Sequence, residues 1–128
     1  MKYIKYVIGL FLFSTLTMCV GVTAMSVQET FNNREVGIYP LVMKSTVHFK
    51  TTQGPQHLIT TKATKPVRAR IIGEFGGSQF NTRWVNATVG GTITWTDSYA
   101  TYDTISSTVT VQNLNKGVTS IYSGKYLF

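Results

Sequence analysis

Apolar and polar residues alternate in short runs along most of the chain after residue 35, which is the pattern of half-buried β-strands. The clearest run is residues 66–72 (PVRARII), in which Val67, Ala69 and Ile71 share one face. Residues 46–51 (TVHFKT) alternate in the same way. Apolar side chains do not recur at the spacing of an amphipathic helix in any window of about a dozen residues. We therefore predict an all-β domain.

Glycine, proline and asparagine divide this region into short segments. About seven or eight strands at this spacing predict a small antiparallel β-sandwich or barrel. Residues 25–35 are polar and are interpreted as a flexible arm or a single helical turn, and residues 73–77 (GEFGG) as the longest loop. We expect strands at residues 36–42, 46–51, 57–62, 66–72, 104–112 and 118–128, and on both sides of Gly90-Gly91.

Two hairpins are predicted from turn residues. Gly90-Gly91 separates two alternating runs, and two adjacent glycines suit a primed two-residue turn, which needs positive φ at both positions. This register pairs Asn86 with Trp95 and places Trp84 and Trp95 together on one buried, aromatic face. Residues 113–117 (NLNKG) predict a second hairpin between the last two strands.

The beginning of the chain has the features of a secretory signal peptide. Within residues 1–24, two lysines precede an uncharged, mostly apolar stretch, and small side chains follow it. We predict cleavage near Ala24-Met25, which leaves residues 25–128 as a single secreted, extracellular β domain. A retained membrane anchor is the alternative, because a spanning helix needs about 17–25 apolar residues. Lipid modification at Cys19 is a third interpretation.

Composition adds two constraints. The chain has 12 Lys and Arg against 5 Asp and Glu, a formal net charge of +7. Its only cysteine is Cys19, within the predicted signal peptide. The predicted secreted domain therefore has neither a disulfide framework nor a thiolate metal site.

The basic residues are concentrated in residues 62–70 (KATKPVRAR), which contain Lys62, Lys65, Arg68 and Arg70 and no acidic residue. Alternation along the strand predicts that both arginines leave the same, outward face. The planar guanidinium matches the geometry of phosphate and carboxylate groups. We predict an anion-binding stripe whose partner is an envelope polymer or lipid headgroups, without specific nucleic-acid binding. The alternative is a solvated face that protects an edge strand from aggregation.

Aromatic residues provide a second candidate surface. Trp84 and Trp95 are assigned to the core by the predicted hairpin. Tyr102, Tyr122 and Tyr126 are less constrained, and we consider them candidates for stacking against a ligand such as a carbohydrate.

No catalytic, metal or cofactor motif is found in the sequence. His48 and His57 have no third ligand nearby in sequence, so they do not predict a zinc site. Asp97 and Asp103 are interpreted as solvated turn residues and not as the paired carboxylates of a hydrolase. We predict a protein that is not an enzyme and has no cofactor and no metal.

The plan of a leader followed by a small, basic, threonine-rich β domain resembles that of secreted bacterial proteins, including sandwich-type bacteriocins. The segment from Trp84 to Gly90 (WVNATVG) is similar to part of one such bacteriocin family, and no residue role is transferred from it. The expected function is binding of an anionic cell-envelope or membrane surface, in an antibacterial, adhesive or matrix-forming role. The alternatives are a carbohydrate-binding or surface-assembly module, including self-association through edge strands, and a small hydrolase.

Overall fold

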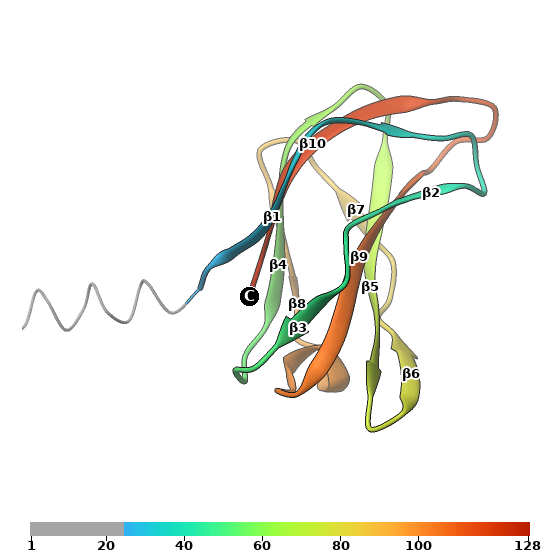
Figure 1. Cartoon of the computed structure of the whole chain (residues 1–128). Helices are drawn as coiled ribbons and strands as arrows, with labels where there is room; N and C mark the ends of the chain where they lie inside the picture. Colours follow the sequence, from blue (N-terminus) through green and yellow to red (C-terminus); the bar gives the residue numbers. More distant parts are fainter. Residues whose placement is uncertain (1–24) are drawn as a thin grey trace, which may run out of the picture.

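A computed structural model describes residues 25–128, which form two antiparallel β-sheets packed face to face (Figure 1). This confirms the predicted all-β class and the antiparallel sandwich. The predicted signal peptide, residues 1–24, lies outside the described residues. The strands are β1 (Val27–Val36), β2 (Val42–Lys44), β3 (His48–Lys50), β4 (Gln56–Ala63), β5 (Val67–Phe75), β6 (Ser78–Asn81), β7 (Val85–Ala87), β8 (Thr92–Trp95), β9 (Ile105–Asn113) and β10 (Ser120–Leu127), and a 3₁₀ helix, η1 (Ser98–Thr101), follows β8. No helix between residues 25 and 128 is long and apolar enough to span a bilayer.

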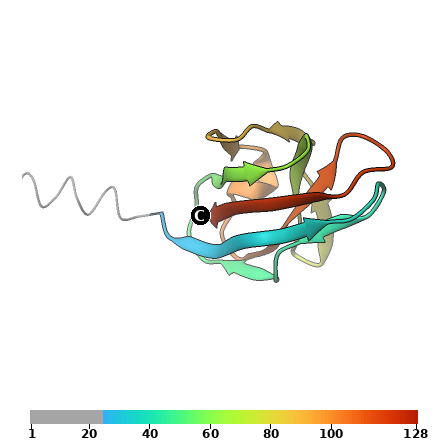
Figure 2. The same cartoon turned by 90° about the horizontal axis from the view of Figure 1, so that it is seen from above.

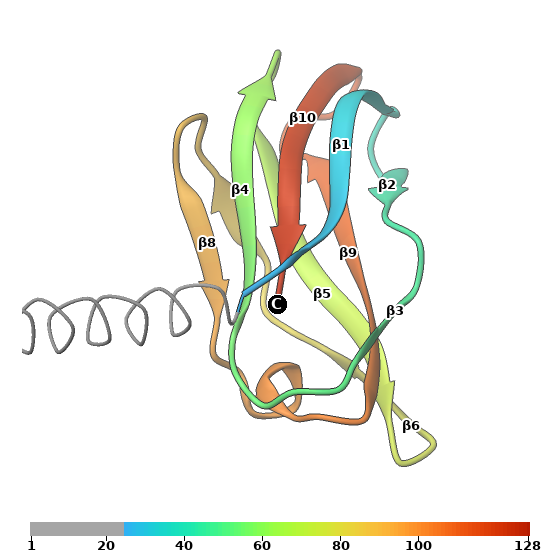
Figure 3. The same cartoon turned by 60° about the vertical axis from the view of Figure 1, so that its left-hand side comes forward.

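The four-stranded sheet has the order β1-β10-β4-β8, and Figure 3 shows these strands side by side. Figure 2 shows the same β10 lying between β1 and β4 when the molecule is seen from above. The six-stranded sheet follows β2-β9-β5-β6, with β3 also paired to β9 and β7 also paired to β5. Among the described strands, β5 and β6 are the only consecutive pair that is hydrogen-bonded, so the chain crosses between the sheets at most connections.

This topology makes both predicted hairpins wrong. β7 pairs with β5, whereas β8 pairs with β4 in the opposite sheet. The turn at Gly90 connects the two sheets: its φ is 82°, and the Gly91 N–H donates to the Thr88 carbonyl at 2.8 Å. β9 and β10 are likewise in different sheets, so residues 114–119 connect one sheet to the other and do not close a hairpin.

The tight hairpin lies at Gly76-Gly77, where the sequence predicted the longest loop. Both glycines have positive φ, 56° and 84°, and Phe75 pairs with Ser78 across the turn. Positive φ at both central residues is what a primed two-residue turn requires. The expected turn chemistry is therefore present, but at the other Gly-Gly pair.

The interpretation of residues 25–35 as a flexible arm is also wrong, because residues 27–36 form β1. This strand pairs along its length with β10, as in Val27 with Leu127 and Val36 with Ser120. Only Phe31 and Val36 of β1 are buried. β1 is an edge strand whose outer face meets solvent, and this position explains why its sequence is so polar.

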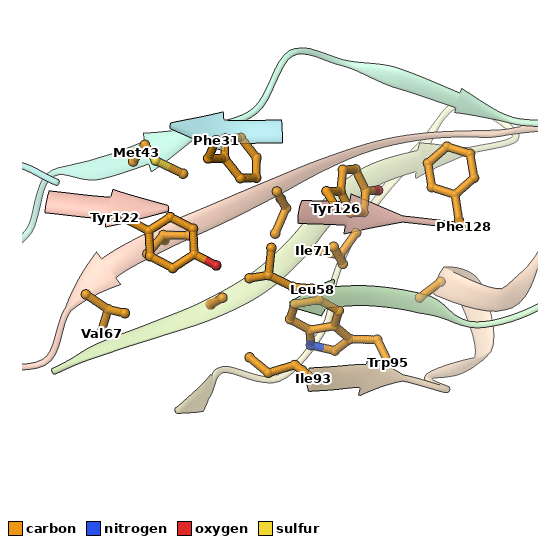
Figure 4. Packing of buried hydrophobic residues seen from close by; sticks show 14 of the residues in the cluster. Phe31, Met43, Leu58, Val67, Ile71, Ile93, Trp95, Tyr122, Tyr126 and Phe128 are labelled. Carbon is orange, nitrogen blue, oxygen red and sulfur yellow. The ribbon is translucent and has the colours of Figure 1, made fainter. Parts of the chain in front are cut away.

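The core lies between the two sheets (Figure 4). The predicted inward positions on β5, Val67, Ala69 and Ile71, are all buried, which confirms the alternation along that strand. Trp95 of β8 is fully buried, as predicted, and packs in the same cluster.

A buried polar network joins the two sheets within this core. The Gln56 side chain in the four-stranded sheet donates to the Ala100 carbonyl at 2.8 Å and accepts from Ser107 of β9 at 2.9 Å. The Tyr126 hydroxyl contacts both Gln56 and Ser107. Because buried polar groups are costly when unpaired, this network fixes how the sheets are stacked.

Candidate anion-binding site

The structure separates the four basic residues of the predicted stripe. Lys62 is exposed on β4, where its Nζ donates to Asn33 Oδ1 at 3.0 Å, and Lys65 is exposed in the connection from β4 to β5. Arg68 and Arg70 lie on β5 in the opposite sheet. The four side chains therefore do not form one continuous face, but the two arginines remain together.

Arg68 and Arg70 occupy successive outward positions of β5, as predicted. Both side chains are half-buried, while their neighbours along the strand point into the core. β9 lies on one side of them, where Arg68 pairs with Gln112 and Arg70 with Thr110. β7 lies on the other side, with Asn86 opposite Arg68.

Trp84 lies over both arginines. The ring centroid is 4.5 Å from Arg68 Cζ and 4.4 Å from Arg70 Cζ. Both distances are within the range of a cation–π interaction. The two guanidiniums and the indole form the site that we call the Arg-Trp cluster.

The assignment of Trp84 to the core is thus wrong, and the register of β7 explains why. Val85 pairs with Ala69, whose side chain is buried, so Val85 also faces inward. Trp84, one residue earlier, faces the opposite way, onto the surface that carries the arginines. It is half-buried because it covers them.

The hydrogen bonds of the Arg-Trp cluster leave donors free. Arg68 Nε and Nη2 donate to Gln112 Oε1 at 3.0 and 2.7 Å, and Gln112 donates in turn to the Pro40 carbonyl at 3.0 Å. Arg70 Nε is buried without a hydrogen-bond partner, and its two terminal Nη groups are neither buried nor bonded to another described residue. Arg70 therefore presents unpaired donors toward solvent.

Neither arginine has a carboxylate partner among residues 25–128, where the ion pairs are those of Glu29 with Arg34 and His48. Burial raises the pKa of Glu29, but hydrogen bonds from His48 and Thr46 outweigh it and hold the pKa below its usual value. The Glu29 carboxylate is thus already paired with Arg34 and His48. The positive charge of the Arg-Trp cluster is not neutralised by the described part of the chain.

A groove of about 460 Å³ continues along the same sheet face beyond Arg70. Its lining includes Ser106 and Thr108 of β9, Ile72 and Glu74 of β5, and Phe49. Phe49, the one apolar residue of β3, is 78% exposed and faces outward. Its neighbour Lys50 is fully buried, which reverses the usual polarity of the alternating strand.

Lys50 is stabilised in this position by main-chain carbonyl groups. Its Nζ donates to the carbonyls of Thr101 and Tyr102, each at 3.4 Å, and to that of Thr52. Burial lowers the pKa of Lys50, and the negative charge of Asp103 partly opposes this effect. Lys50 therefore links the end of β3 to the end of η1 and the residue after it, and it is not available to an external anion.

The predicted aromatic surface is wrong for two of its three members. Tyr122 and Tyr126 are completely buried, because β10 has a neighbour on each side and these alternate residues point into the core. Tyr102 is 39% exposed and belongs to a surface cluster with Tyr99, at a ring separation of 5.6 Å, and Phe75, at 5.0 Å.

The two histidines are separated by the sandwich, since β3 and β4 belong to different sheets. His48 Nε2 lies 2.9 Å from Glu29 Oε1, and His57 Nδ1 lies 3.0 Å from Thr94 Oγ1. Burial lowers the pKa of His57. Over the described residues, no group of three or more His, Cys, Asp or Glu side chains is placed to hold a metal ion.

Sequence reasoning found the two arginines from their alternate spacing but missed Trp84 and Gln112. The Trp84 contact depends on β7 pairing with β5, which no local pattern indicates. No known family model matches the chain, and no curated protein matches it in sequence.

Proposed function

We propose that this chain is a secreted, non-enzymatic β-sandwich protein that binds a phosphate-bearing anion of the cell envelope at the Arg-Trp cluster. The observation that carries the proposal is the stacking of Arg68 and Arg70 on one indole ring without a carboxylate partner in residues 25–128. The phosphate belongs to an envelope polymer or to lipid headgroups, and both sources offer the same chemistry to guanidinium donors.

The electrostatics of the pair favour an anion. Since both guanidinium carbons lie within 4.5 Å of the same centroid, they are no more than about 9 Å apart, and physiological salt only partly screens their repulsion at that distance. A phosphate bound between or beside them relieves this repulsion. Trp84 and Gln112 already restrict the two side chains, so binding costs less conformational entropy than it would for free surface arginines.

Secretion is the part of the proposal supported by residues 1–24, whose charge, hydropathy and small residues fit a signal peptide. An exported protein that binds phosphate polymers or headgroups would act on cell surfaces, in an antibacterial, adhesive or matrix-forming role. Mass spectrometry of the secreted product should give an N-terminus within a few residues of Met25. Recovery of the intact chain in the membrane fraction would contradict secretion.

Retention on immobilised polyphosphate and on phosphatidylglycerol liposomes tests the anion site and separates its two sources. The test variant is Arg68→Gln/Arg70→Gln, and the control is Lys62→Gln/Lys125→Gln, which removes the same charge from the four-stranded sheet. We expect the arginine variant to lose about tenfold or more in affinity for at least one support, because charge-assisted hydrogen bonds are lost. Equal losses in both variants would mean that only net charge matters, and the assignment of the site would be wrong.

A second candidate function, carbohydrate binding, retains one structural argument. Tyr99 and Tyr102 remain exposed to 50% and 39% and form an aromatic surface with Phe75, and Tyr99 also packs on the buried ring of Phe80. Retention on insoluble glycans should then fall in Tyr99→Ala/Tyr102→Ala and not in the arginine variant. The reverse result would leave the anion site as the binding surface.

A further inference from the structure

Four connections between the sheets meet at one end of the sandwich, which we call the loop end. Figures 1 and 3 show them on the side of the molecule opposite η1 and the β5–β6 hairpin. The connections are residues 37–41 (β1–β2), 64–66 (β4–β5), 88–91 (β7–β8) and 114–119 (β9–β10).

Hydrogen bonds hold these loops in fixed positions. Asn113 is fully buried, and its Nδ2 donates to the carbonyls of Gly37 at 2.8 Å and Val118 at 3.0 Å, which links the first loop to the last. The Leu114 N–H donates to the Pro66 carbonyl at 3.0 Å, which adds the second loop. The β7–β8 loop is joined to β4, because the Gly90 N–H donates to the Thr60 carbonyl at 2.8 Å.

Three of these four loops nevertheless expose large apolar side chains. Ile38, Leu41, Val89 and Leu114 are exposed to 50%, 63%, 54% and 38%. Single exposed apolar residues are ordinary on protein surfaces, but several on adjoining, hydrogen-bonded loops indicate an interaction surface. Their positions are fixed in advance, so contact with a partner requires little ordering.

The loop end is also basic. Its four connections contain Lys65 and Lys116 and no acidic residue, and Lys116 Nζ lies 5.9 Å from the ring centroid of Tyr39. The nearest acidic residue in sequence is Glu35, at the end of β1. Exposed apolar side chains and lysines on the same set of loops are complementary to a surface that is negatively charged outside and apolar beneath.

We propose that the loop end docks onto an anionic lipid bilayer, with its apolar side chains entering the boundary between headgroups and acyl chains. The proposal rests on the anion site and names its partner, since Arg68 and Arg70 then bind headgroup phosphates. Arg68 follows Pro66 by two residues, or about 7 Å at the rise of a β-strand. Surface-bound proteins bury their apolar groups about 5–10 Å deep, so Arg68 comes level with the headgroups.

Charge favours a bilayer over a second copy of the chain as the occupant. Two loop ends facing each other would bring Lys65 and Lys116 of both copies together, and like charges across an interface disfavour association. Anionic headgroups instead attract each lysine or arginine that approaches the membrane surface.

Co-sedimentation with vesicles tests the docking surface with a matched pair of variants. Ile38→Ser/Leu41→Ser removes apolar side chains from the loop end. Val47→Ser/Phe49→Ser removes apolar side chains that are more exposed as a pair, from β3 and the residue before it. All are expressed from the full chain, so any processing of the N-terminus is common to them. On vesicles of phosphatidylglycerol and phosphatidylcholine, we expect about tenfold or more loss of partitioning for the first variant and little change for the second.

A fluorescence measurement locates the surface directly. The unmodified chain, with Trp84 and Trp95, gives the background signal. Relative to it, the tryptophan introduced by Leu41→Trp should add emission that shifts to shorter wavelength on anionic vesicles and is quenched by brominated acyl chains, whereas the one introduced by Phe49→Trp should add neither effect. Equal behaviour of the two, or a concentration-dependent dimer abolished by Leu41→Ser, would overturn the proposal.

Polyphosphate retention separates failure of this inference from failure of the proposed function. Ile38→Ser/Leu41→Ser should bind polyphosphate as the unmodified chain does, because the Arg-Trp cluster is intact. Binding to polyphosphate without any binding to anionic vesicles would overturn the bilayer inference and leave the anion site standing.

Discussion

Replacement of Trp84 by alanine distinguishes a surface cation–π clamp from a core residue. The side chain is half-buried and contacts two guanidiniums at 4.5 and 4.4 Å. Each such contact contributes about 0.5–2 kcal/mol, depending on how far it is desolvated. We therefore expect Trp84→Ala, which removes both contacts, to lower the free energy of unfolding by about 1–4 kcal/mol. Trp95→Ala should cost about 3–5 kcal/mol, because that ring is fully buried.

A double-mutant cycle isolates the contact itself. Arg70→Met keeps most of the aliphatic stem of the side chain but removes the cation, so its combination with Trp84→Ala reports the coupling between the two groups. We expect a coupling of about 1 kcal/mol, measured by urea unfolding followed by far-ultraviolet circular dichroism. Fluorescence is less suitable because one of the two tryptophans is removed.

Two outcomes would refute this reasoning. A cost for Trp84→Ala as large as that for Trp95→Ala would identify Trp84 as a core residue, as the sequence had predicted. Zero coupling between Trp84 and Arg70 would show that the ring and the guanidinium do not stabilise each other, whatever the cost of each single change.

Further predictions concern the scaffold. Burial raises the pKa of Tyr122 to about 12 from 10.0. Between pH 10 and 12 the phenol ionises in the unfolded state before it does so in the folded state, so the free energy of unfolding should fall by about 2–3 kcal/mol over that range. Tyr122→Phe should remove this part of the alkaline loss in pH-dependent urea unfolding. Gly73→Ala should destabilise by several kcal/mol, because the added Cβ would lie 2.1 Å from the Ser106 carbonyl oxygen; unchanged thermal stability would contradict the β5–β9 register. Asn113→Ala should cost about 1–3 kcal/mol by leaving buried carbonyls unpaired, and rapid amide exchange confined to the loop end should accompany it.

The parts of the fold that depend on local sequence could be predicted. Alternation along β5 correctly placed Val67 inward and Arg68 outward, because side-chain direction in a strand has a period of two wherever one face is buried. The all-β class followed from the same periodicity. The prediction that two adjacent glycines form a tight hairpin turn holds for Gly76-Gly77, although it was made for the other pair.

Long-range pairing could not be predicted, and most errors follow from it. Gly90-Gly91 has the composition of a hairpin turn, but its flanking strands have better partners in opposite sheets. Because β7 pairs with β5 and not with β8, Trp84 lies on the surface and not in the core. Tyr122 and Tyr126 were misplaced for a similar reason, because nothing local reveals that β10 is an inner strand. The Arg-Trp cluster combines two side chains of β5 with the residue that precedes β7, and it could be recognised only once the pairing of β7 with β5 was known.

Binding of a phosphate-bearing anion at Arg68, Arg70 and Trp84 underlies the proposed function. A titration with inorganic phosphate, followed by the Nε–H signals of the arginines and the indole N–H signals in nuclear magnetic resonance spectra, tests it most directly. We expect saturable shifts at Arg68, Arg70 and Trp84, with Trp95 unaffected because it is enclosed in the core. Shifts confined to other arginines such as Arg34 and Arg83, or no saturable shift at Arg68 and Arg70, would contradict this binding.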